Sequence, residues 1–120
     1  MGYVYNIYSR EGKYNNRKAK INSITFDSQK EATRYLELKK LEELGYIKDL
    51  KLQPKFLLQE GYRKNGKKIR EVNYIADFMY YDCESGEEVI EDVKGIKTDV
   101  YKLKKKLFEY KYKEYTIREI

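Results

Sequence analysis

The sequence predicts an α/β fold, more closely a mixed α+β sheet with two helices, in a single domain over residues 1–120. Three observations support this prediction. Helical periodicity appears at residues 26–45 and again from residue 98 or 99 to about 111. Three extended runs lie between the helices, at residues 50–62, 68–81 and 88–94, separated by turn sequences. A short extended run at 115–120 completes the order helix, three-strand meander, helix, strand.

Composition limits the kinds of chemistry that the chain can perform. It has 26 Lys and Arg against 20 Asp and Glu, a net charge of +6, which favours a polyanionic partner such as nucleic acid. With no His and a single cysteine, Cys83, it lacks the usual zinc ligands and the residues for Ser-His or Cys-His catalysis. We therefore expect an enzyme of this composition to use carboxylates, Lys, Tyr and hard metal ions. Without a long apolar run we expect no membrane partner, and a lone cysteine suits the reducing cytoplasm.

The first helix carries an acidic residue with two possible roles. Residues 28–31 (Ser-Gln-Lys-Glu) fit a capping box, and Gly45 fits a C-terminal stop. On a helical wheel Glu31 falls inside the apolar face. Its local sequence is explained by capping alone, and a role in a functional site is the alternative. The rest of that face is expected to comprise Ala32, Tyr35, Leu36, Leu38, Leu41 and Leu44.

Basic residues cluster in three places. Residues 1–22 are expected to form a basic N-terminal arm, irregular over 13–20, with a short strand or ordered segment near residues 4–8. Asn65-Gly66 predicts a type I′ hairpin with a basic tip. The start of the second helix offers free amides to a phosphate. Each cluster is either a solvated surface or a nucleic-acid contact, and the candidates for contact are Arg17, Lys18, Lys64, Lys67, Lys68, Lys97, Thr98 and Lys102.

The apolar positions predict which faces are buried. On the central strand, one face is expected to hold Val72, Tyr74, Ala76, Phe78 and Tyr80, and the other Ile75, Asp77, Met79 and Tyr81. Within the expected strand at residues 50–62, Pro54 predicts an edge position or an irregularity. The buried stripe of the second helix is expected to comprise Val100, Leu103, Leu107 and Tyr110.

Two carboxylates are expected to face each other in the second hairpin. A regular hairpin centred between Glu84 and Ser85 places Asp77 opposite Asp92, and by the same register Phe78 opposite Glu91 and Ile75 opposite Lys94. Directly opposed like charges destabilise an antiparallel pair. We therefore expect a divalent cation between Asp77 and Asp92, with Lys94 one diagonal step away. An ordinary ion-pair network is the alternative.

This element order, with Asp on one strand and Asp-x-Lys on the next, resembles the PD-(D/E)xK nuclease superfamily. Ala76-Asp77 stands at its PD position, and Asp92-Val93-Lys94 at its (D/E)xK position. Glu31 would be the first-helix Glu common in that superfamily. Ala76 departs from the pattern by replacing Pro. The resemblance implies a restriction-endonuclease-like core.

Longer segments are similar to small phage and prophage proteins described as Holliday-junction-resolvase-like. The similarity covers nearly everything from residue 13 to the C-terminus, and the segments that carry it are Phe26-Asp27-Ser28-Gln29-Lys30-Glu31-Ala32, Leu52-Gln53-Pro54-Lys55-Phe56, Tyr74-Ile75-Ala76-Asp77-Phe78 and Glu91-Asp92-Val93-Lys94-Gly95.

The resemblance implies an endonuclease that hydrolyses phosphodiester bonds of branched DNA in phage recombination and depends on Mg²⁺ or Mn²⁺. Asp77, Asp92, the Val93 carbonyl and Glu31 would hold metal, and Lys94 would orient the attacking water. Gln53 becomes a weaker active-site candidate. Symmetric cleavage of two strands implies a homodimer, and a phage or prophage protein would work in the cytoplasm of a bacterial host.

Two other functions remain open. The same core serves site-specific, packaging or transposase-type endonucleases that cut duplex DNA. A non-catalytic nucleic-acid-binding module is the alternative from a different class. The complete Asp77, Asp92 and Lys94 set favours catalysis, because a degenerate copy is expected to lose one of the three.

Overall fold

The computed structural model describes residues 5–7, 18–21 and 23–120. These residues form a mixed α+β structure with two helices, as the sequence predicts. The chain divides into two compact units, Met1–Leu44 and Gly45–Ile120, and each is described by itself. Neither helix is long and apolar enough to cross a membrane.

The first unit combines a small antiparallel sheet with the first helix. Strands β1 (Tyr5–Ile7), β2 (Ala19–Ile21) and β3 (Ile24–Phe26) pair in that order, and α1 (Gln29–Glu43) packs on β2 and β3. The prediction of an irregular segment over residues 13–20 is wrong at Ala19 and Lys20, which belong to β2. This strand forms because its two apolar side chains, Ala19 and Ile21, are fully buried. Lys18 lies outside any strand and is exposed. Residues 13–17 of that segment, and the expected residues 4 and 8, lie outside the described residues.

Helix α1 begins and ends where its capping residues predict. The Ser28 side chain accepts a hydrogen bond of 3.1 Å from the Glu31 backbone N–H, which satisfies one of the free amides of the first turn. At the other end Gly45 adopts a φ of +83°, the left-handed conformation that glycine accepts without strain. Tyr35 packs its ring 5.1 Å from that of Phe26.

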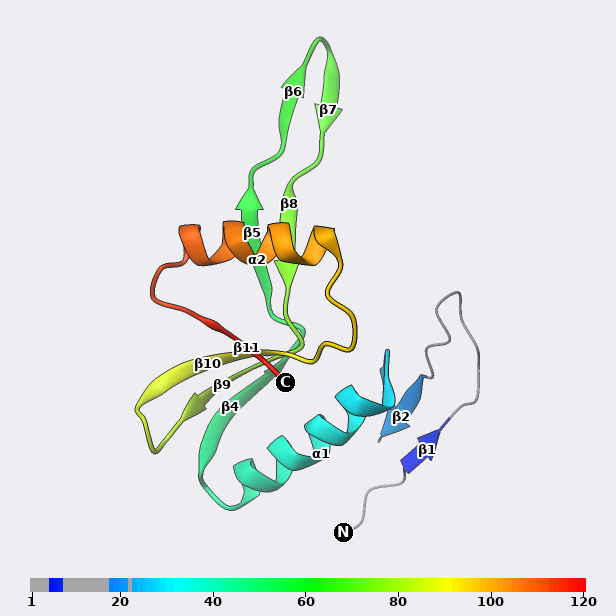
Figure 1. Cartoon of the computed structure of the whole chain (residues 1–120), viewed down its shortest axis with the longest axis vertical. Helices are drawn as coiled ribbons and strands as arrows, with labels where there is room; N and C mark the ends of the chain where they lie inside the picture. Colours follow the sequence, from blue (N-terminus) through cyan, green and yellow to red (C-terminus); the bar gives the residue numbers. More distant parts are fainter. Residues whose placement is uncertain (1–4, 8–17, 22) are drawn as a thin grey trace. The chain divides into compact units, whose positions relative to one another are not determined.

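The second unit holds a mixed sheet of four strands (Figure 1). Its order is β11 (Ile117–Glu119), β10 (Glu87–Asp92), β9 (Phe78–Asp82) and β4 (Ile47–Leu52). β10 pairs with β11 in parallel and with β9 in antiparallel fashion. Two further pairs, β5 (Lys55–Gln59) with β8 (Val72–Ile75) and β6 (Tyr62–Lys64) with β7 (Lys67–Ile69), extend from it.

The irregularity predicted at Pro54 is confirmed, because the run 50–62 divides into β4, β5 and the first residue of β6. The run 68–81, which was predicted as one strand, is interrupted as well. Pro54 has no N–H, and the residue before it, Gln53, has a φ of +50°. Across the bend, the Gln53 N–H donates to the Asp77 carbonyl at 2.9 Å and the Ala76 N–H donates to the Pro54 carbonyl at 3.1 Å. The two chains therefore stay hydrogen-bonded to each other while both turn, and Asp77 lies in the turn.

This bend changes which side chains share a face, so the expected alternation is wrong beyond Ala76. Tyr74 and Ala76 belong to one core cluster with Met79 and Ile90. Phe78 is also fully buried, yet it lies outside that cluster. Because neighbouring residues of a strand point to opposite faces, the turn at residues 76–77 shifts the pattern by one position.

Helix α2 (Asp99–Lys111) begins at Thr98, whose side chain accepts a hydrogen bond of 3.1 Å from the Tyr101 N–H. Its buried face is not the expected one, because Tyr101 and Phe108 are buried. Phe108 packs against the rings of Phe56, Tyr74 and Tyr112 at centroid distances of 4.9, 5.2 and 5.1 Å. Aromatic rings bury more area than aliphatic side chains, and Val100, Leu103 and Leu107 face solvent. Tyr110, the fourth residue of the expected stripe, is also exposed.

We predict that Phe108→Ala lowers the free energy of unfolding by about 3–5 kcal/mol, because it empties a fully buried aromatic site. The matched control is Leu103→Ala on the same helix, where the side chain is 56% exposed and the expected change stays within about 0.5 kcal/mol. Urea denaturation of both variants tests this. Equal destabilisation by the two substitutions would contradict the observed orientation of α2.

Candidate active site

Asp92 ends strand β10 with its carboxylate almost fully buried. One oxygen, Oδ2, accepts a short hydrogen bond from the Tyr74 hydroxyl. The other, Oδ1, lies 2.8 Å from the Lys94 ammonium, but this ion pair lacks the directional geometry of a hydrogen bond. Within the described residues no other group hydrogen-bonds to Oδ1. A buried carboxylate oxygen is costly unless a positive group satisfies it, and the Lys94 ammonium is the positive group in contact with Oδ1.

Asp77 lies beside Asp92, in the turn between β8 and β9. Its N–H donates to the Glu91 carbonyl at 3.1 Å, and its Oδ2 accepts a 2.7 Å hydrogen bond from the Val93 N–H. The pKa of the Asp77 carboxyl is raised to about 6, chiefly by burial and in smaller part by the neighbouring Asp92 carboxyl. The Val93 N–H and the Lys94 charge act in the opposite direction. The pair is therefore a site of negative charge that a cation would relieve.

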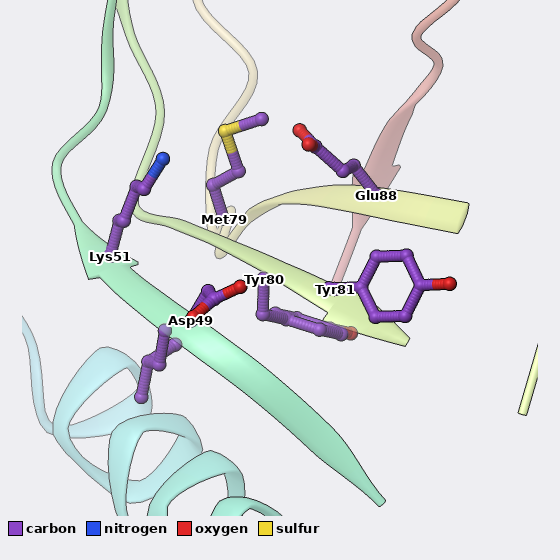
Figure 2. A pocket seen from close by; sticks show the side chains of 7 residues that line it. Asp49, Lys51, Met79, Tyr80, Tyr81 and Glu88 are labelled. Carbon is purple, nitrogen blue, oxygen red and sulfur yellow. The ribbon is translucent and has the colours of Figure 1, made fainter. Parts of the chain in front are cut away.

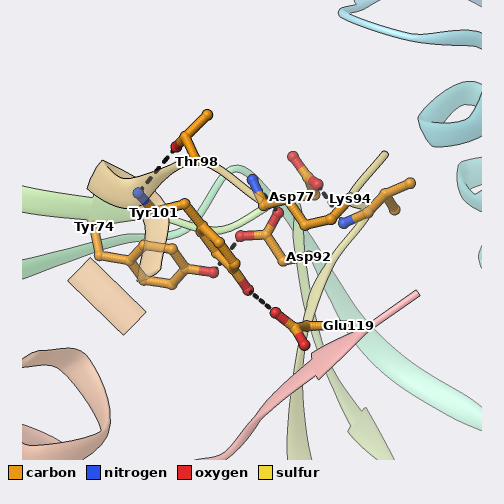
Figure 3. Close-up of polar contacts among 8 residues, drawn as sticks. Tyr74, Asp77, Asp92, Lys94, Thr98, Tyr101 and Glu119 are labelled. Atoms are coloured by element: carbon orange, nitrogen blue, oxygen red, sulfur yellow. Dashed lines mark hydrogen bonds and ion pairs between the residues drawn. The ribbon is translucent and has the colours of Figure 1, made fainter. Parts of the chain in front are cut away.

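Lys94 is held from two sides (Figure 3). Its ammonium contacts the Asp92 carboxylate and lies 4.3 Å from the centre of the Tyr101 ring. The Tyr101 hydroxyl donates a 2.8 Å hydrogen bond to Glu119, whose pKa is lowered by this bond and by Lys97. Lys97 and Lys105 approach Glu119 at 3.1 and 3.4 Å. Strand β11 and helix α2 thus position the lysine that follows β10.

The predicted register of the second hairpin is confirmed where the strands pair. Phe78 pairs with Glu91 and Met79 with Ile90. Asp77 follows this register to its position next to Asp92, although it lies outside β9. The expected pairing of Ile75 with Lys94 is wrong, because the bend at residue 76 sends Ile75 to Lys55 of β5.

The predicted register correctly assigns Asp92 and its acidic neighbour Glu91 to opposite sides of the sheet, with Asp92 on the side of Asp77. Glu91 is fully buried on the opposite side of β10, where it accepts a short hydrogen bond from the Tyr80 hydroxyl. Arg118 of the parallel strand β11 lies 4.0 Å from the same carboxylate. Glu91 therefore belongs to a separate polar network that ties β9, β10 and β11 together.

The other predicted site residues lie on several elements of the two units. Glu31 lies in the first unit with 6% of its surface exposed, and Asp77, Asp92 and Lys94 lie in the second. Gln53 touches the site through its backbone bond to Asp77. Thr98 is the helix cap, and Lys97 pairs with Glu119. Arg17 is outside the described residues, and the remaining candidates are exposed: Lys18, Lys64, Lys67, Lys68 and Lys102.

Three residues that contact the site were not predicted from the sequence: Tyr74, Tyr101 and Glu119. The alternation of a straight strand placed Tyr74 on the face opposite Asp77, and only the bend brings its hydroxyl to Asp92. Tyr101 stood outside the expected apolar stripe of its helix. The abundance of Tyr, 14 residues with no Trp, is the one compositional signal that pointed to polar aromatic contacts.

A cavity of about 470 Å³ lies elsewhere in the second unit. Figure 2 shows Lys51, Met79 and Glu88 extending in the same direction from β4, β9 and β10. None of the four residues Glu31, Asp77, Asp92 and Lys94 lines it. The candidate chemistry is therefore located at the turn beside Asp92, away from this cavity.

The described residues contain no group of three or more His, Cys, Asp and Glu side chains suited to a metal ion. Two carboxylates are present, at Asp77 and Asp92. A cation held by this pair needs further oxygen ligands from the backbone, from water or from a substrate, as Mg²⁺ usually has.

We predict that Asp77→Asn becomes more stable relative to the wild type as the pH rises from about 4 to about 7 in EDTA. An unfolded Asp titrates near 3.9, and the folded group titrates at about 6. In this window the folded protein binds more protons, so the contribution of Asp77 to stability falls with rising pH. Allowing for solvent screening of the half-buried group, the change is on the order of 1–2 kcal/mol.

Chemical denaturation of both proteins at each pH measures the difference between their free energies of unfolding. Contributions from other groups cancel in this difference, including that of Glu119, whose lowered pKa acts with the opposite sign. A difference that stays constant across this range would contradict the raised pKa of Asp77.

Comparison with known proteins adds a family assignment to this geometry. No curated protein and no solved structure gives a significant match. A family model described as "Protein of unknown function (DUF1064)" matches residues 11–120, which is most of the chain. The chain therefore belongs to the DUF1064 family.

Proposed function

We propose that this protein is a divalent-metal-dependent DNA endonuclease that hydrolyses phosphodiester bonds. The observation that carries the proposal is the convergence of Asp77, Asp92 and Lys94, with a buried Asp92 oxygen that no described residue hydrogen-bonds. The same three residues occupy the motif positions of the PD-(D/E)xK resemblance.

The donor set suits Mg²⁺ or Mn²⁺. One oxygen of each carboxylate is held by a protein donor, Asp92 by the Tyr74 hydroxyl and Asp77 by the Val93 N–H. These bonds orient both groups. A hard cation would use the second oxygen of each carboxylate, and that of Asp92 contacts the Lys94 ammonium here. The Val93 carbonyl is the backbone ligand that the resemblance implies. A bound cation would supply charge stabilisation at the phosphate and the leaving oxygen.

Lys94 is placed to act on the attacking water or on the phosphate. Its ammonium lies between a carboxylate and an aromatic ring, and the side chain is only partly exposed. From this position it orients a water by hydrogen bonding, or it stabilises negative charge that develops on the phosphate oxygens. Tyr101, held by Glu119, restricts the directions in which the lysine can move.

The charge of the chain and the resemblance favour DNA as the substrate. A net charge of +6 attracts a polyanion, and exposed lysines and arginines are available to contact phosphates. Branched DNA is the structure that the resolvase-like resemblance suggests. Symmetric cleavage of a junction requires two active sites, so the proposal includes a homodimer.

A non-catalytic DNA-binding module is the second candidate, and the exposed basic hairpin formed by β6 and β7 favours it. That hairpin would bind DNA whether or not phosphodiester bonds are cut. Cleavage therefore decides between the two candidates, and binding alone does not.

We predict cleavage of four-way junctions, flaps or duplex DNA in Mg²⁺ or Mn²⁺, and loss of at least about two orders of magnitude in rate for Asp92→Asn and Lys94→Ala. The matched control is Glu87→Gln, an exposed acid at the start of the same strand, which should retain the wild-type rate. Labelled substrates run on a denaturing gel provide the measurement, with single-stranded DNA as a further comparison.

If the wild type binds these substrates without cutting any of them, the binding-module candidate stands and the endonuclease proposal fails. If Asp92→Asn cuts as fast as Glu87→Gln, cleavage is independent of the carboxylate pair.

A pair of substitutions separates the two roles of Glu31. Ser28→Ala removes the cap and should lower stability by about 1 kcal/mol, with cleavage unchanged under folded conditions. Glu31→Gln keeps the backbone N–H that the cap uses, so we expect stability near the wild-type value and cleavage reduced at least tenfold. Thermal unfolding and cleavage rates are measured for each. Full activity of Glu31→Gln would leave Glu31 with only a structural role.

A further inference from the structure

Strands β6 and β7 form a narrow basic ribbon, here called the basic ribbon and defined as residues 62–69 (Figure 1). Its tip, Asn65-Gly66, has φ values of +51° and +77°, which fits the predicted type I′ turn. The cross-strand pairs are Lys64 with Lys67 and Arg63 with Lys68. All four of these side chains are exposed.

This ribbon concentrates positive charge that its surroundings do not neutralise. Two adjacent cross-strand pairs place cation opposite cation, which destabilises an antiparallel hairpin. Among the described residues, no ion pair involves any of these four side chains, and the one hydrogen bond that Arg63 makes is to the Gly66 carbonyl in the same turn. Such a surface is stabilised by an anionic partner.

The cations occupy both faces of the ribbon. Residues paired across two strands share a face, and successive residues alternate between faces. Lys64 and Lys67 therefore point to one face, and Arg63 and Lys68 to the other. A ribbon that lay flat on a phosphate backbone would need charge on one face only. Charge on both faces suits a groove whose two walls both carry phosphates.

We infer that the basic ribbon enters the major groove of double-stranded DNA about one helical turn from the phosphate at the candidate active site, an inference that rests on the proposed function. The major groove of B-DNA, about 12 Å wide, admits a two-stranded ribbon. The deep, narrow major groove of an RNA duplex does not. Tyr62 is the one aromatic residue of the ribbon, so base stacking along a single strand is disfavoured.

The distance follows from the chain that joins the tip to the site. From Gly66 to Asp77 the chain runs along β7 and β8, mostly extended. At about 3.3 Å per residue, this path spans roughly 30 Å after allowance for the irregular residues between the strands. One turn of B-DNA is about 34 Å, or about 10 base pairs. A duplex bound at Asp77 and Asp92 would therefore present its next turn to the ribbon.

Three variants, each of which removes two positive charges, test this inference. Lys64→Gln/Lys67→Gln alters one face, Arg63→Gln/Lys68→Gln alters the other, and Lys40→Gln/Lys106→Gln alters two exposed helix positions as the matched control. Binding of a 30-base-pair DNA duplex is followed by fluorescence anisotropy in EDTA over a range of salt concentrations. No cleavage occurs under these conditions.

Both ribbon variants should weaken binding about tenfold at 0.2 M salt and lower the slope of log K against log salt by about 2, while the control keeps the wild-type slope. The loss should be small on an RNA duplex of equal length and on a DNA duplex of 8 base pairs. An effect from one face only overturns groove insertion. The inference is equally overturned by ribbon variants that match the control, or by a wild type that does not bind the duplex.

This test is independent of the proposed chemistry. Asp92→Asn should bind the 30-base-pair duplex with the wild-type salt slope even though it does not cut. If the wild type binds the duplex through the ribbon but does not cut it, only the endonuclease proposal fails. If both ribbon variants cut a long duplex and bind it with unchanged affinity, only the inference about the ribbon fails.

Discussion

The hydrogen bond from Tyr74 to the buried Asp92 carboxylate is the interaction around which the second unit is arranged. A carboxylate at this depth is stable only if its oxygens have partners. The tyrosine reaches it because the paired strands bend together at residues 53–54 and 76–77. That bend turns β8 out of the mixed sheet and onto β5, and it leaves Asp77 in the turn next to Asp92. The site and the change of strand partners therefore have the same structural cause.

Helix α2 serves both the core and the site. Phe108 fills the aromatic core between the helix and strands β5 and β8, while Tyr101, seven residues earlier on the same face, reaches Glu119 and supports Lys94. The core and the candidate chemistry are thus coupled through one helix face. The aliphatic residues of α2 face solvent, so the buried rings of Tyr101 and Phe108 determine which face of the helix packs on the sheet.

Local signals in the sequence were sufficient for the helix ends, for the Asn65-Gly66 turn and for the register that separates Asp92 from Glu91. Each depends on residues close together in the chain. The bend was only partly foreseen, because Pro54 indicated an irregularity but not that the opposite strand would turn with it. Tyr74, Tyr101 and Glu119 were missed for the same reason, since their contacts with the site depend on this bend and on how α2 and β11 pack. The relation of Glu31 to the site remains an expectation from the resemblance.

The central claim is that Asp77 and Asp92 hold a divalent cation, and Mn²⁺ tests it without reference to any substrate. Paramagnetic broadening of backbone amide signals in the ¹⁵N-labelled protein locates the bound ion directly. We expect substoichiometric Mn²⁺ to broaden the amide signals of Asp77, Val93 and Lys94 selectively, and Asp92→Asn to abolish the effect. Broadening centred on other acidic positions such as Glu87 and Glu88, or unchanged in Asp92→Asn, would contradict it.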